Sequence, residues 1–181
     1  MIISTVLAAA AALSTPSAAS TQDAFFRNLT ALCGKRFAGK LVSSDAADAA
    51  MRSQSMLMHV RDCSATQIRI PFQVGADRSR TWVITRTEAG LRLKHDHRHE
   101  DGTEDALSQY GGDTADAGSA MRQAFPADAF SKTLFTTKGN PASVTNVWAV
   151  EVLPGEAFTY SLARQNRDFR VRFDLSKPLA E

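Results

Sequence analysis

The sequence predicts an all-β domain with short helices, folded as an antiparallel β-barrel of about eight or nine strands. Three observations favour this class. Apolar and polar residues alternate in many short segments, which is typical of strands with one buried face. Short turn sequences such as Pro154-Gly155 separate these segments. The chain has 181 residues, of which 44% are hydrophobic, and this is enough for one domain with a substantial core.

An amphipathic helix is predicted at the start of the domain. Ser20 and Asp23 have the spacing of a capping box, with Asp in the acidic position. Gly34 is well suited to end the helix. The apolar residues between them follow helical spacing, namely Phe25, Phe26, Leu29, Leu32 and Cys33. We expect this helix to plug one end of the barrel.

Nine further segments are predicted as strands. In one of them, Ile68, Ile70 and Phe72 alternate with polar residues, and the others follow the same pattern. The segments are 36–43, 55–62, 67–74, 80–87, 90–98, 118–125, 146–153, 158–163 and 169–175. Residues 44–52 and 127–135 are predicted as short helical inserts, and 100–118 as an irregular stretch. A β-sandwich is the alternative arrangement of the same strands.

The first 19 residues are predicted to be a secretory signal peptide that is cleaved after Ala19. An apolar run over 6–13 precedes the small residues Ser17 and Ala19 at the −3 and −1 positions. This run is too short for a membrane-spanning helix, which needs about 20 residues, and no transmembrane segment is predicted in the mature chain. We therefore expect a single domain over 20–181, either periplasmic or secreted.

The two cysteines are consistent with that location. In an oxidising compartment, Cys33 and Cys63 are the only intramolecular pair that this chain can form. A disulfide between them would connect the end of the opening helix to the second strand. The alternative is two buried free thiols.

The predicted arrangement resembles the calycin-type barrels of lipocalins and their bacterial relatives. The resemblance lies in the opening helix, the alanine-rich insert after the first strand and the nine hairpin-connected strands. The chain is also similar to uncharacterised secreted proteins of bacteria. The barrel resemblance implies a small apolar ligand held inside. Phe72, Phe158 and Tyr160 would then form part of the pocket wall, with His95 and His97 as a polar anchor.

Three of the four histidines lie in one segment, at His95, His97 and His99. Alternation places them on the same strand face as Leu91 and Leu93, which is the inward face. Two histidines at positions i and i+2 of a strand can reach one metal ion, and imidazole suits transition metals. If His95 and His97 are buried, we expect the pKa of at least one to fall below its ordinary value.

The histidines also support a second hypothesis. The spacing of His97, His99, Glu104 and Gly111 is similar to the first metal-binding motif of cupins. That resemblance implies a metal-dependent enzyme, with His97, His99 and Glu104 as ligands and a transition metal as cofactor. His95 is a further candidate ligand on the same strand.

The composition and the motifs argue against several classes of function. The net charge is only +2, and no concentrated basic stripe indicates a nucleic-acid partner. The chain contains no nucleophile elbow, phosphate-binding glycine loop or HExxH motif, so an enzymatic role is not indicated beyond the cupin-like hypothesis. The leading hypothesis is a small-ligand-binding barrel. A structural envelope protein with a filled core is the remaining alternative, and no oligomeric state is indicated.

Overall fold

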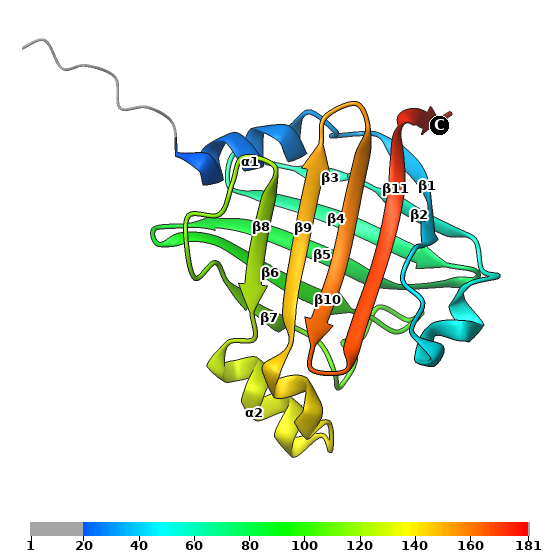
Figure 1. The fold of residues 1–181 in the computed structure, drawn as a ribbon, viewed down its shortest axis with the longest axis vertical. Helices are drawn as coiled ribbons and strands as arrows, with labels where there is room; N and C mark the ends of the chain where they lie inside the picture. Colours follow the sequence, from blue (N-terminus) through cyan, green and yellow to red (C-terminus); the bar gives the residue numbers. More distant parts are fainter. Residues whose placement is uncertain (1–19, 181) are drawn as a thin grey trace, which may run out of the picture.

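The computed structural model describes residues 20–180 and shows a nearly closed antiparallel barrel (Figure 1). The strands follow one another in the order β7-β6-β5-β4-β2-β1-β11-β10-β9-β8, and β3 pairs with β4 beside this path. In Figure 1, strands β8 to β11 run upright in front, and β4, β5 and β6 cross behind them. The predicted fold class is confirmed.

The elements have the following bounds. The strands are β1 Arg36–Leu41, β2 Met56–His59, β3 Asp62–Cys63, β4 Gln67–Val74, β5 Asp77–Thr87, β6 Gly90–His97, β7 Tyr110–Asp113, β8 Arg122–Pro126, β9 Val147–Leu153, β10 Ala157–Arg164 and β11 Arg167–Leu179. The helices are α1 Thr21–Thr30, the 3-10 helix η1 Ala46–Met51, α2 Ala129–Thr137 and the 3-10 helix η2 Pro141–Thr145.

The strand count is slightly higher than predicted, because β3 and β7 come in addition to the nine expected segments. β7 lies inside the stretch that was expected to be irregular. Its centre is Gly111-Gly112, which carries no apolar alternation and has low strand propensity. β7 forms because β6 offers it a partner, with Lys94 opposite Gly111 and His95 opposite Tyr110.

Helix α1 covers one end of the barrel, as expected for a plug. The capping box is present, since the Ser20 side chain accepts from the backbone of Asp23 and the Asp23 side chain accepts in return. The buried face of α1 contains Phe25, Phe26 and Leu29. Side chains of α1 also donate across to the chain around β7 and β8, as from Gln22 to Thr114 Oγ1 at 3.0 Å and from Asn28 to the Ala120 carbonyl at 2.9 Å.

The predicted disulfide between Cys33 and Cys63 is present, with a Cα–Cα distance of 6.3 Å. It connects the residues after α1 to β3. A disulfide is typical of extracellular or periplasmic proteins. Across residues 20–180, no helix is long and apolar enough to cross a membrane. The predicted signal peptide over 1–19 lies outside the described residues.

Both predicted helical inserts contain helix. The first is η1, which is held to the β10–β11 turn by Arg167. The guanidinium of Arg167 donates to both oxygens of Asp48, each at 2.6 Å, and to Asp45 at 2.9 Å. The second insert is α2, which begins two residues later than predicted, after the cap Asp128.

The seam between β7 and β8 is closed by the first turn of α2. Ser131 Oγ accepts from the Gly111 amide at 2.7 Å and donates to the Gly111 carbonyl at 2.8 Å. The Asp128 amide donates to the same carbonyl at 2.9 Å. A Cβ atom at Gly111 would lie 1.9 Å from the Leu93 carbonyl oxygen, so only glycine fits at this position. The barrel is therefore closed by a helix cap in place of a strand ladder.

Candidate functional site

The histidine-bearing strand β6 ends at the barrel end opposite α1, here called the α2 end. His97 is the last residue of β6 and pairs with Arg80, while His95 pairs with Trp82 one register step further in. The turn between β10 and β11 reaches the same end, and Figure 1 shows α2 beyond it. The expected inward orientation therefore brings His95 and His97 toward the end that α1 does not cover.

His95 is fully buried and is held by two hydrogen bonds. Its Nδ1 lies 3.1 Å from the Tyr110 carbonyl oxygen, and its Nε2 lies 2.7 Å from the Tyr160 hydroxyl. Because a carbonyl only accepts, Nδ1 must carry the proton and Nε2 must accept from Tyr160. Burial lowers the pKa of His95 to about 3. The predicted downward shift of at least one pKa is confirmed, and its main cause is desolvation.

His97 is half-buried and contacts Tyr110. The Tyr110 hydroxyl lies 3.2 Å from His97 Nε2, and the Tyr110 ring stacks on the His95 ring with centroids 4.5 Å apart. Burial lowers the pKa of His97 and the charge of Arg80 lowers it further, while Asp105 and Asp77 oppose the change. Burial also raises the pKa of Tyr110 to about 12. We call His95, His97, Tyr110 and Tyr160 the histidine–tyrosine network.

The residues expected to form the pocket wall are packed against one another. Trp82 lies at the centre, stacked between Phe72 at 4.6 Å and Tyr160 at 4.3 Å, and its ring is 6.0 Å from that of Phe158. Phe173 packs edge-on against the same group. The interior around Trp82 is therefore an aromatic cluster.

Trp148 lies beside the network and carries an unsatisfied donor. Its ring is 5.1 Å from the His95 ring and 5.6 Å from the Tyr110 ring. The indole Nε1 is buried and has no hydrogen-bond partner among the described residues. A buried donor of this kind costs free energy unless water or a ligand satisfies it.

The last predicted metal ligands lie outside the barrel. His99 and Glu104 are exposed; His99 Nε2 is 3.9 Å from Asp105, and Glu104 accepts from the Gln109 side chain at 2.7 Å. Between residues 20 and 180, no group of three or more His, Cys, Asp or Glu side chains is close enough to hold a metal ion. The structure therefore brings His95 and His97 together and separates them from His99 and Glu104, and the metal hypothesis stays a prediction.

A hollow of about 860 Å³ adjoins the end of β6, and we call it the strand-end hollow. It is lined by Ala76, Asp77, Arg78, Ser79, Arg98, His99, Glu100 and Asp105. Asp105 connects it to the network, because the Asp105 amide donates to the His97 carbonyl at 3.0 Å. Sequence reasoning selected His99 but missed the β4–β5 turn. The Gly75-Ala76-Asp77 turn sequence was a visible signal, but only strand pairing places it opposite His99.

Asp96 is a second group that sequence reasoning missed. It lies on the outer face of β6, where alternation predicts an exposed side chain, yet it is only 5% exposed. Arg69 and Arg98 donate to its two oxygens at 2.6 and 2.8 Å. Burial by itself raises the pKa of Asp96, but the two guanidinium hydrogen bonds outweigh it and the net shift is downward. These two ion pairs hold the outer face of β6 in place.

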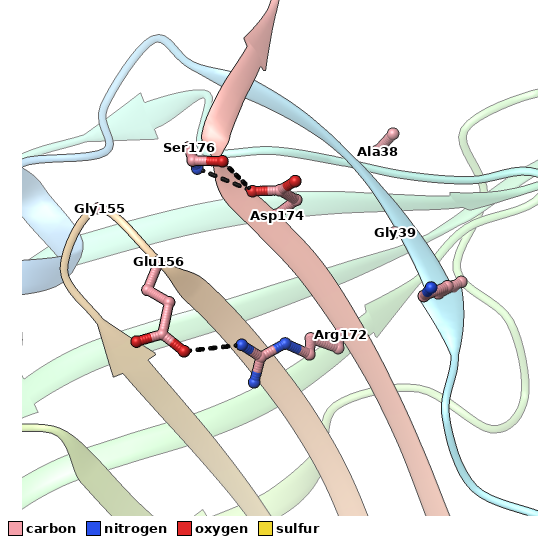
Figure 2. A pocket seen from close by; sticks show the side chains of 8 residues that line it. Ala38, Gly39, Gly155, Glu156, Arg172, Asp174 and Ser176 are labelled. Atoms are coloured by element: carbon pink, nitrogen blue, oxygen red, sulfur yellow. Dashed lines mark hydrogen bonds and ion pairs between the residues drawn. The ribbon is translucent and has the colours of Figure 1, made fainter.

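Another hollow lies between β1 and the β9–β10 turn, and its lining contains no histidine (Figure 2). Figure 2 shows Arg172 donating to Glu156, at 3.0 Å, and Ser176 donating to Asp174. Arg172, Glu156, Ser176 and Asp174 therefore form two pairs at this hollow.

The comparisons with known proteins do not assign this site. No family model matches the chain, and neither the curated proteins nor the solved structures contain a match. The candidate site therefore rests on its own geometry: a rigid histidine–tyrosine network at the α2 end and a charged hollow beside it.

Proposed function

We propose that this chain is a secreted or periplasmic binding protein that holds a small ligand at the α2 end. The ligand would occupy the strand-end hollow, contact His99 and reach toward His97. The observation that carries the proposal is the hollow at the end of β6, whose lining includes His99, two residues after the half-buried His97.

The rigidity of the network supports this role. His95 uses both ring nitrogens and is neutral at physiological pH, so it acts as a fixed support for Tyr110 and not as a ligand contact. Tyr110 in turn positions His97. A binding group held by packed neighbours loses little conformational freedom when a ligand arrives, and this favours affinity.

The lining of the hollow favours a polar ligand. Arg78 and Arg98 provide donors, and Asp77 and Asp105 provide acceptors. A ligand with both donors and acceptors would match this mixture better than a purely apolar molecule, which would displace water from these groups without replacing its hydrogen bonds. The calycin resemblance implied an apolar ligand, and the proposal departs from it at this point.

Native mass spectrometry tests the proposal with protein purified from the cells that produce it. We expect a bound mass that disappears when the same sample is denatured. His99→Gln and His97→Gln should each lower the occupancy about tenfold, as expected for losing one strong hydrogen bond.

Lys177→Gln is the control, because Lys177 is exposed on β11 and lies outside the strand-end hollow and the other hollows described here. Its occupancy should equal that of the parent. Equal occupancy in all three variants, or no bound mass in repeated preparations, would exclude a ligand at this site.

A structural or interaction protein with a filled core is the second candidate. The aromatic cluster around Trp82 favours it, because packed rings stabilise the barrel without any ligand. Preparations that never contain a bound small molecule would favour this candidate.

The hypothesis of a metal-dependent enzyme is tested by zinc uptake. If His97, His99 and Glu104 bind zinc together, the parent should take up one equivalent and Glu104→Gln should lose it. No stoichiometric uptake by the parent would end that hypothesis.

A further inference from the structure

A separate hollow of about 240 Å³ lies on the outer face of the sheet formed by β1, β2, β4 and β5. We call it the arginine hollow. It is lined by Arg36, Leu57, His59, Arg61, Pro71, Phe72, Gln73, Arg78 and Thr81. Three of these residues are arginines, and no carboxylate is among them.

Strand register explains why these side chains meet. Arg36 on β1 pairs with His59 on β2, and Pro71 on β4 pairs with Thr81 on β5. Side chains that alternate with the buried residues of a strand point to the opposite face. The outward residues of four strands therefore form neighbouring rows, and Arg78 joins them from the start of β5.

The three arginines of this hollow differ in their ion pairing. Within residues 20–180, neither Arg36 nor Arg78 forms an ion pair with a carboxylate. Arg61 pairs with Asp62 at 2.8 Å, but both side chains are about half exposed. An exposed pair of this kind contributes little stability, so Arg61 can exchange its partner at small cost. Arg69 differs, because it is committed to the buried Asp96.

We propose that the arginine hollow binds the phosphate group of a small phosphorylated ligand. A guanidinium presents a planar set of donors that matches phosphate oxygens, and several guanidiniums favour a group with more than one negative charge. Gln73 and Thr81 add uncharged hydrogen-bonding groups. Leu57 and Pro71 supply an apolar surface for the organic part of the ligand. The arginine hollow shares Arg78 with the strand-end hollow, whereas Arg36, Leu57 and Gln73 line the arginine hollow alone.

The test is titration of the full domain with glycerol 3-phosphate and with inorganic phosphate, followed by amide chemical shifts at low ionic strength. Low salt is needed because exposed charges are screened. We expect saturable shifts at Arg36, Leu57 and Arg78. Arg36→Gln and Arg78→Gln should each weaken binding about tenfold. The Arg36→Gln result assigns the site, because Arg36 does not line the strand-end hollow.

Arg122→Gln is the matched control. Arg122 is exposed on β8, outside the arginine hollow, and it lacks a carboxylate partner among the described side chains. Its affinity should stay within about twofold of the parent, as expected for long-range charge effects screened by solvent. The three substituted side chains lie at the surface, so the variants should fold, and circular dichroism is the check.

Binding to vesicles distinguishes a lipid headgroup from a soluble phosphorylated ligand. Sedimentation with phosphatidylcholine vesicles that contain phosphatidic acid indicates a lipid headgroup if Arg36→Gln abolishes it. Binding of glycerol 3-phosphate without vesicle binding indicates a soluble ligand. The proposal is wrong if neither soluble probe gives saturable shifts, or if Arg122→Gln weakens binding as much as Arg36→Gln.

Discussion

Replacement of His95 by Gln should change how stability depends on pH. Burial lowers the pKa of His95 from 6.5 to about 3. Between these two pH values, His95 is protonated in the unfolded chain and neutral in the folded chain. Stability is fully present above pH 6.5 and falls as the pH drops through that value, and the fall continues until pH 3. Between pH 7 and pH 5, this one group costs about 2 kcal/mol of unfolding free energy.

This magnitude depends little on the pKa in the folded state. As long as the folded chain keeps His95 neutral at pH 5, only the ordinary pKa of the unfolded chain sets the loss. The carboxylates with lowered pKa values, such as Asp96, contribute below their ordinary value of 3.8 and so act outside this range. His97 is present in both parent and variant, so the difference between their pH dependences reports mainly His95.

Urea unfolding at pH 7, 6 and 5, followed by tryptophan fluorescence, provides the assay. His95→Gln should be less stable than the parent at pH 7, by about 1–3 kcal/mol for the altered buried hydrogen bonds. Its loss of stability from pH 7 to pH 5 should be smaller than that of the parent by about 2 kcal/mol. If the variant does not fold, the ring of His95 in the parent should show no NMR titration above pH 4.

Two results would refute the reasoning. One is an equal pH dependence in the parent and in His95→Gln. The other is a His95 titration near pH 6.5 in the folded parent, which would mean that the imidazole is hydrated and the histidine–tyrosine network is not closed to water.

The remaining predictions concern the plug, the seam and the network. Replacing Cys33 and Cys63 by Ser should lower the unfolding free energy by about 3–4 kcal/mol, because the closed loop in the unfolded chain is lost; urea unfolding measures this, and reduction of the parent should have the same effect. Ser131→Ala removes both hydrogen bonds to the Gly111 backbone and should lower the unfolding free energy by about 1–3 kcal/mol, with faster hydrogen exchange of the Gly111 amide. An unchanged exchange rate would mean that Ser131 does not hold β7 at the seam. Tyr160→Phe leaves the Nε2 acceptor of His95 without its donor and should cost about 1–3 kcal/mol by the same assay; a loss below about 0.5 kcal/mol would indicate that water replaces the hydroxyl.

Much of the fold follows from local sequence. Residues such as Ile68, Ile70 and Phe72 alternate with polar neighbours, and this period identifies a strand without knowledge of its partners. The capping box at Ser20 and Asp23 is likewise complete within four residues. The disulfide was predictable because two cysteines allow a single pair.

The candidate site depended on contacts that the sequence pattern does not contain. Alternation gave His95, His97 and His99 the same orientation, but β6 ends at His97 and Arg98 then forms an isolated bridge with Glu104. His99 is therefore exposed, while His95 is buried against side chains from β7, β9 and β10.

The same limit applies to β7 and to the arginine hollow. Gly111-Gly112 is a strand only because β6 and the Ser131 cap provide partners for its backbone. Arg36 and Arg78 are more than 40 residues apart and meet only through the register of four strands. The sequence by itself determined which segments are strands and which faces are buried, because both follow from the period of the side chains. Only the tertiary structure decided which charges meet and which rings fill the barrel, because these depend on register across strands.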